Sequence, residues 1–221
     1  MEGSPYSASW LATCQSGRYI VFMSRDPKSS GGETNVWRAD TTNNQVIKLT
    51  TGTFDASPIC SPDGKWVYYT SPNPPEPKIQ KVSIDGGAPK TVSNMEILPG
   101  IDVSRDGKLL AFWDGDTVGE INAENGKIGG KFPCDPRMGS ASGEATYPHF
   151  TPDGKALVYT IHVNGVDNIW AQPLDGAPAH PITTFKSDEI FDFHWSPSGD
   201  KLGIVRGRTE SNVVLIREAN P

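Results

Sequence analysis

The sequence predicts an all-β protein made of five similar units, and three observations support this prediction. A short turn followed by a β-rich run recurs five times along the 221 residues. Glycine and proline, with 23 and 19 copies, are scattered through the chain and therefore indicate many turns. No apolar pattern with the i, i+3, i+4, i+7 spacing of a helix is sustained anywhere along the chain.

The recurring turn is clearest at Ser61-Pro62-Asp63-Gly64 and Thr151-Pro152-Asp153-Gly154. Ser or Thr can bond the backbone ahead, Pro presets φ, Asp suits the third position, and Gly takes the positive φ that lets a hairpin resume its twist. Successive turn glycines are 47, 43, 47 and 45 residues apart, which is about the length of a four-stranded propeller blade. These glycines are Gly17, Gly64, Gly107, Gly154 and Gly199.

Each turn is predicted to join the first and second strands of one unit, with the first strand innermost. The predicted first strands are residues 7–13, 57–60, 100–103, 147–150 and 192–195. The second strands are 18–22, 65–69, 108–112, 155–159 and 200–204. The third strands are 35–39, 78–82, 118–122, 168–172 and 212–216, and outer strands such as 90–92 and 181–183 follow further turns.

A single unit of this kind cannot cover both faces of its sheet, so stacking around a shared axis is expected. The sequence therefore predicts one β-propeller domain over residues 1–221, with four-stranded antiparallel blades and repeats near 7–53, 54–96, 97–143, 144–187 and 188–221. The recurring tryptophans are expected to pack between blades: Trp37, Trp66, Trp170 and Trp195.

The last repeat leaves no residues for an outer strand, and two arrangements explain this. A five-blade ring can close with one three-stranded blade, which we favour because it leaves fewer exposed sheet edges. In the alternative, the chain is part of a propeller with more blades.

The repeats resemble those of TolB-like and WD40-like propellers, most closely at residues 61–69, at 151–155 and where Asn-Ile-Trp precedes Leu-Asp-Gly. They also resemble repeat regions that follow a kinase or winged-helix domain in some bacterial multidomain proteins. The resemblance implies the fold and a binding role, but no particular partner. The chain departs from the pattern at Gln15-Ser16-Gly17, at Arg105 where Pro is usual, and in an irregular connection over 134–145.

Composition excludes several classes of function. A net charge of −6 with no cationic cluster argues against nucleic-acid binding, and no apolar run is long enough for membrane insertion. Residues 1–5 lack the charged and apolar segments of an export signal. The sequence leaves open whether the compartment is the cytoplasm or the periplasm, and it also leaves the oligomeric state open. The odd number and wide spacing of the cysteines predict packed thiols rather than disulfides or a zinc site: Cys14, Cys60 and Cys134.

No catalytic motif is found, so we expect a protein that is not an enzyme and needs no cofactor. Gly139-Ser140-Ala141-Ser142-Gly143 only approaches a nucleophile elbow, because Ala stands where the nucleophile would be. The alternatives are a propeller attached to a prolyl-oligopeptidase-like hydrolase and a metal-dependent enzyme centred on the channel.

The candidate site is the mouth of the central channel. His149, His194 and Asp102 occupy the same position in three repeats, five residues before the turn glycine, whereas Ala12 and Ile59 occupy it in the first two. Two imidazoles and a carboxylate could hold a metal, but hydrogen bonding around a wet channel is the favoured reading, so no metal site is predicted. The remaining candidates are Asp192 beside the channel and the rim aromatics Tyr147 and Phe191.

We therefore predict a non-catalytic scaffold for protein–protein interaction or ligand docking at this mouth, with a protein or peptide as the expected partner, since functional residues concentrate on loops carried by a rigid framework. The alternative from another class is a sensory or regulatory fragment of a larger signalling protein.

Overall fold

The computed structural model describes residues 7–29, 31–71, 77–97, 100–139 and 147–210. These residues form eighteen strands in five antiparallel sheets, with one short 3₁₀ turn, η1, at Gln15–Gly17. The prediction of an all-β propeller is confirmed. Within the described ranges no helix has the length and apolar character needed to cross a bilayer.

Four sheets contain four strands each, paired in chain order, and we call them blades one to four. Blade one is β1 (Ser9–Cys14), β2 (Tyr19–Arg25), β3 (Thr34–Asp40) and β4 (Val46–Lys48). Blade two is β5 (Ala56–Cys60), β6 (Trp66–Ser71), β7 (Lys78–Ser83) and β8 (Lys90–Ser93). Blade three is β9 (Asp102–Val103), β10 (Leu109–Trp113), β11 (Thr117–Asn122) and β12 (Ile128–Pro133). Blade four is β13 (His149–Phe150), β14 (Ala156–Val163), β15 (Val166–Pro173) and β16 (His180–Pro181).

The fifth sheet has two strands among the described residues, β17 (Glu189–Trp195) and β18 (Leu202–Gly207), and we call it blade five. The third strand predicted for it, residues 212–216, lies outside the described residues.

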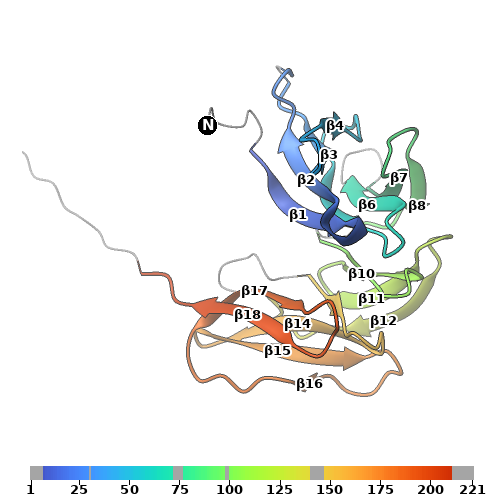
Figure 1. The fold of residues 1–221 in the computed structure, drawn as a ribbon. Helices are drawn as coiled ribbons and strands as arrows, with labels where there is room; N and C mark the ends of the chain where they lie inside the picture. Colours follow the sequence, from blue (N-terminus) through green and yellow to red (C-terminus); the bar gives the residue numbers. More distant parts are fainter. Residues whose placement is uncertain (1–6, 30, 72–76, 98–99, 140–146, 211–221) are drawn as a thin grey trace, which may run out of the picture.

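The first strand of each blade is the innermost, as predicted. Strand β1 contacts β5, β5 contacts β9, and β9 contacts β13, whereas the later strands of each blade lie further out. Figure 1 shows the blades succeeding one another from blue through green to orange around this common centre. The side chains of the first strands therefore face a shared channel.

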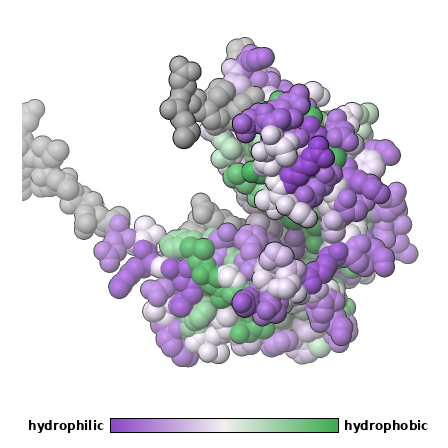
Figure 2. Space-filling view, in the orientation of Figure 1, coloured by the Kyte–Doolittle hydropathy of each residue, from purple (hydrophilic) through white to green (hydrophobic). Residues whose placement is uncertain are grey.

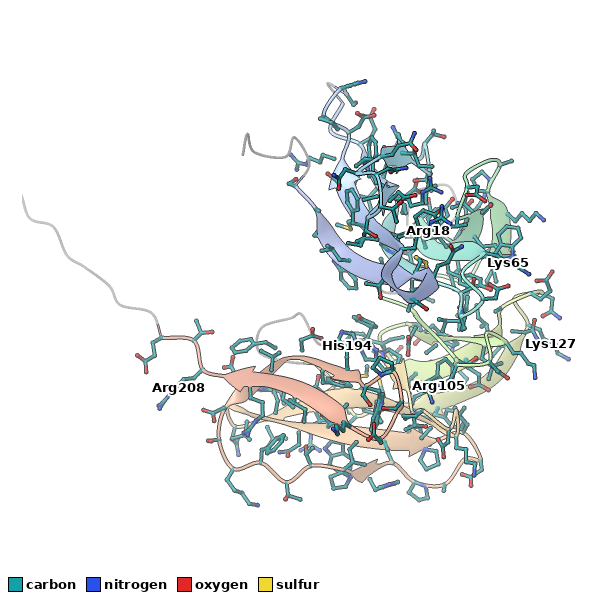
Figure 3. The ribbon with its side chains drawn as sticks, in the orientation of Figure 1. Arg18, Lys65, Arg105, Lys127, His194 and Arg208 are labelled. Atoms are coloured by element: carbon teal, nitrogen blue, oxygen red, sulfur yellow. A yellow bond between two sulfur atoms is a disulfide. The ribbon has the colours of Figure 1, made fainter. Side chains whose placement is uncertain are left out.

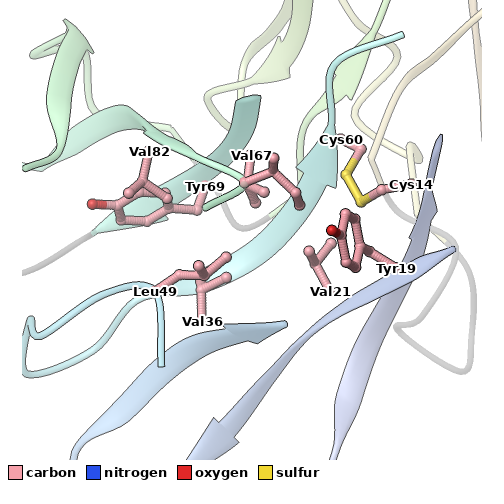
Figure 4. Packing of buried hydrophobic residues seen from close by; sticks show 10 residues of the cluster. Cys14, Tyr19, Val21, Val36, Leu49, Cys60, Val67, Tyr69 and Val82 are labelled. Carbon is pink, nitrogen blue, oxygen red and sulfur yellow. A yellow bond between two sulfur atoms is a disulfide. The ribbon is translucent and has the colours of Figure 1, made fainter. Parts of the chain in front are cut away.

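The hydrophobic core is divided into layers, each lying between two consecutive blades. Successive side chains of a strand point to opposite faces, so one strand serves two layers. On β6, Tyr69 packs with Val21 and Val36 of blade one, while Tyr68 packs with Leu110 of blade three. Figure 4 shows the first of these layers, with Tyr69 and Val67 facing the blade-one side chains.

Four such layers join the five blades in sequence, and among the described residues no comparable layer joins blade five to blade one. No described strand of blade one pairs with one of blade five. Leu11 on β1 is 63% exposed and Val205 on β18 is 58% exposed. Figure 2 shows apolar surface where β17 and β18 lie in Figure 1. We call the boundary between blades one and five the seam.

The recurring turns also touch one another across the blades. The side chain of Gln15 in the first turn donates from Nε2 to the carbonyl of Gly64 in the second, at 3.0 Å. In the third turn Arg105 donates to the carbonyls of Pro197 and Ser198 in the fifth. Arg105, a departure from the usual Pro, thus joins blade three directly to blade five.

The prediction of packed thiols is wrong for two of the three cysteines. Cys14 and Cys60 form a disulfide in the core layer between blades one and two, with their Cα atoms 5.6 Å apart (Figure 4). They lie 46 residues apart in the chain and become neighbours only because β1 and β5 pack side by side. Cys134 is a free thiol.

Candidate functional site

Five repeat-equivalent side chains line the channel. Ala12, Ile59, Asp102, His149 and His194 each stand five residues before the turn glycine, and all five line one cavity of about 380 Å³. At these five positions blades three to five carry polar or charged side chains, and blades one and two carry apolar ones. The ionisable groups at this level of the channel therefore come from blades three to five.

A second set of equivalent positions lies seven residues before the turn glycine, near the start of each first strand, and forms the rim of this cavity. Trp10, Ser57 and Tyr147 belong to it and line the same cavity. The strand register shifts next to Trp10 in β1 and next to Ser57 in β5, and both residues have positive φ, 50° and 52°. A β-bulge of this kind redirects a side chain, and bulges recur beside functional sites.

Blade three carries Gly100 at this rim position, and its lack of a side chain allows Tyr147 to approach. A Cβ on Gly100 would lie 2.5 Å from the Cβ of Tyr147, and the glycine has a φ of 108°. The Tyr147 ring then lies 5.4 Å from Trp10 and 4.4 Å from His149, measured between ring centroids. A row of aromatic rings thus leads from the rim into the channel.

Asp102 and His149 form the polar centre of the channel. The Nδ1 atom of His149 lies 3.7 Å from Oδ2 of Asp102, which also accepts the backbone N–H of Phe150 at 2.8 Å. Burial raises the pKa of Asp102 to about 6, against backbone hydrogen bonds that favour the ionised form. Burial also lowers the pKa of His149 to about 3, with His194 adding to the effect. Near neutral pH the pair therefore consists of a carboxylate and a neutral imidazole.

His194 and Asp192 come from β17 and are more exposed. The Nε2 atom of His194 lies 3.3 Å from Oδ1 of Asp192, and the His194 ring packs edge-on to His149 at 5.3 Å. Both residues line a second cavity, of about 510 Å³, with Ser9, Trp10, Leu11, Tyr147 and Phe191. Since Ser9 to Leu11 belong to blade one, this cavity lies at the seam.

The channel has two unlike ends. The cavities of about 380 and 510 Å³ share Trp10, Leu11, Tyr147 and His194, and together we call them the strand-start mouth. At the other end a cavity of about 270 Å³ is lined by residues of the recurring turns, among them Pro62, Arg105 and Pro152, and we call it the turn mouth. Figure 3 shows His194 and Arg105 close to the centre of the molecule.

All six predicted site residues line these cavities: Asp102, Tyr147, His149, Phe191, Asp192 and His194. The metal alternative gains no support from the geometry, since within the described residues no three His, Cys, Asp or Glu side chains are placed to hold an ion. Residues 140–143 of the Gly/Ser-rich near-match lie outside the described part of the chain.

Trp10 is the main site residue that the sequence analysis missed. The signal was present, because Trp10 precedes Gly17 by the same seven residues that separate Tyr147 from Gly154. It was missed because only the position five residues before the turn glycine was compared across all five repeats.

The raised pKa of Asp102 predicts that this side chain costs stability near neutral pH. The folded-state pKa of Asp102 is about 6, whereas the unfolded value is 3.8. The protonated carboxyl therefore contributes to stability fully below pH 3.8, and this contribution is lost as the pH rises through about 6. Asp102→Asn is therefore expected to raise the free energy of unfolding by about 2 kcal/mol near pH 7 and to change it little near pH 4. Urea unfolding at both pH values measures this, and equal effects at both would contradict it.

Comparison with known proteins identifies the fold and leaves the activity open. No protein-family model matches the chain, and no curated protein matches it. Among solved structures it is similar to TolB from Acinetobacter baumannii, with 21% identity and a TM-score of 0.61 over 79% of this chain and 42% of that one. A putative TolB from Agrobacterium tumefaciens has 21% identity and a TM-score of 0.66, over 92% of this chain and 71% of that one.

A third similar structure is an enzyme, oligogalacturonate lyase from Vibrio parahaemolyticus. It has 15% identity and a TM-score of 0.67, over 89% of this chain and 57% of that one. The chain thus has the fold of TolB-like β-propellers, which an enzyme also has, and it spans less than half of the Acinetobacter protein.

Proposed function

We propose that the chain is a non-catalytic binding scaffold whose strand-start mouth takes a segment of a protein or peptide. The supporting observation is the convergence of Trp10, Tyr147, His149, Asp192 and His194, from three blades, on two joined cavities. Concave sites with aromatic walls and a few fixed polar groups are typical of ligand binding. The fold holds Trp10, His149, Asp192 and His194 on strands, and Tyr147 just before β13, so little ordering is needed when a ligand binds.

The expected stability cost of Asp102 is consistent with a functional role for the channel. A carboxyl that is mostly shielded from water and has no lysine or arginine partner is unfavourable, and such groups persist where binding or chemistry uses them. Asp102 is held by a backbone N–H and lies beside a neutral histidine, so nothing in its described surroundings neutralises it fully.

Replacing both channel histidines tests the proposal. Peptides selected from a random displayed library on the purified chain should bind His149→Ala/His194→Ala at least tenfold more weakly, about 1.4 kcal/mol. The matched control is His180→Ala, an exposed histidine on β16 outside every cavity of the channel. Circular dichroism would show that the variants are folded, and unchanged affinity in the folded double variant would eliminate the channel as the site.

An enzyme acting at the channel is the second candidate, and one observation favours it. Asp102 and His149 form a carboxyl–imidazole pair of the kind used in general acid–base catalysis. Turnover of ester, lactone, uronate or peptide substrates by the purified chain, abolished in Asp102→Asn, would replace the scaffold proposal with this one.

A further inference from the structure

Among the described residues, the strand-start mouth is lined by carboxylates and by no lysine or arginine. These carboxylates belong to Asp102 and Asp192. The buried histidine between them, His149, is neutral near pH 7 because its pKa is lowered to about 3. An occupant of this mouth is therefore expected to bring a positive charge.

Aromatic faces surround these carboxylates. Trp10 is 37% exposed, its ring lies 5.4 Å from that of Tyr147, and Phe191 lines the seam side of the same mouth. The face of an aromatic ring attracts a cation and also packs against the alkyl stem of a lysine or arginine. The walls and the charges of the mouth thus favour the same kind of group, an apolar stem that ends in a cation.

The buried imidazole adds an unused polar group. His149 is 7% exposed and lines the cavity of about 380 Å³. Its Nδ1 atom lies 3.7 Å from Oδ2 of Asp102, which is longer than a hydrogen bond. A donor entering the cavity would find both the imidazole and the carboxylate available as acceptors.

The opposite end of the channel is less favourable for the same ligand. The turn mouth shares Asp102, His149 and His194 with the strand-start mouth, but it is also lined by Arg105, whose guanidinium is held in place by the carbonyls of Pro197 and Ser198. The added cation opposes a basic group there, so we expect such a group to enter at the strand-start mouth.

We propose that the strand-start mouth recognises a basic side chain, lysine or arginine, of a protein or peptide partner. The cationic end lies toward Asp192 and Asp102, and the stem lies against Trp10 and Tyr147. This inference rests on the proposed function and adds the chemical class of the ligand. It requires neither catalysis nor a metal.

The test uses four blocked pentapeptides that differ only at the central residue: arginine, lysine, norleucine or glutamate between small neutral residues. Isothermal titration calorimetry on the intact chain should show arginine and lysine binding at least tenfold more tightly than norleucine, and glutamate most weakly. Added salt should weaken the first two and leave norleucine unchanged.

A pair of charge-matched variants assigns the effect to the mouth. Asp192→Asn should weaken binding of the arginine peptide about fivefold, since an exposed charge pair contributes up to about 1 kcal/mol. Glu96→Gln removes the same charge from an exposed position outside the mouth and should leave affinity unchanged. Equal losses in both variants would mean that net charge alone attracts the peptide, and would overturn the proposal.

The outcomes separate this inference from the proposed function. If norleucine and arginine peptides bind equally and the double histidine variant loses both, the peptide site stands and recognition of a cation is wrong. If library peptides bind but none of the four pentapeptides does, a basic side chain is insufficient and the inference is also wrong. If no peptide of either kind binds, both proposals fail.

Discussion

Replacing Cys14 and Cys60 together by serine is expected to lower the free energy of unfolding by about 4 kcal/mol. The disulfide closes a loop between residues 46 apart, and constraining such a loop in the unfolded chain contributes roughly this amount. Blade one depends on the bond more than an interior blade would, because a described core layer joins it to blade two only. Urea unfolding of both proteins under oxidising conditions measures the difference.

The free cysteine provides the control for this experiment. Cys134→Ser removes a partly buried thiol that belongs to no disulfide and should cost about 1 kcal/mol or less. Adding a reductant should destabilise the original chain by the same amount as the double substitution and should leave the double variant unchanged. A reductant that has no effect on the original chain would contradict the prediction.

The second large effect is expected at Gly126, which follows β11. A Cβ at this position would lie 1.9 Å from the carbonyl oxygen of Val92 on β8, and the glycine has a φ of 68°. Gly126→Ala therefore both strains the backbone and forces blades two and three apart, and we expect a loss of about 3 kcal/mol. Thermal or urea unfolding measures the loss.

Gly86 offers a matched control, because it lies in the corresponding turn of blade two. Its φ is 90°, but a Cβ there would meet no atom within 4 Å, so Gly86→Ala pays for backbone strain alone. We expect about 1 kcal/mol for that strain. Similar losses at both glycines would show that the contact between the Gly126 turn and Val92 contributes little.

Much of the fold could be predicted because propeller blades are local structures. Each turn has its own glycine, and three of the five also have a proline, to set φ locally; within a blade each strand pairs with the next along the chain, as β5 to β8 do. Equivalent positions in a repeat also share a place in space. This is why counting back five residues from the turn glycines correctly predicted which side chains lie together in the channel. Those side chains are Asp102, His149 and His194.

The sequence by itself determined the strands, the turns and the set of residues that face the channel, since all three depend on interactions within about 15 residues. Only the tertiary structure decided which distant groups meet. It joined Cys14 to Cys60, placed Arg105 in contact with the fifth turn, and placed the ring of Trp10 beside that of Tyr147 at the channel rim. Such contacts depend on how tightly the blades pack together and on which blades are the first and the last. Neither can be predicted from the residue pattern within a single repeat.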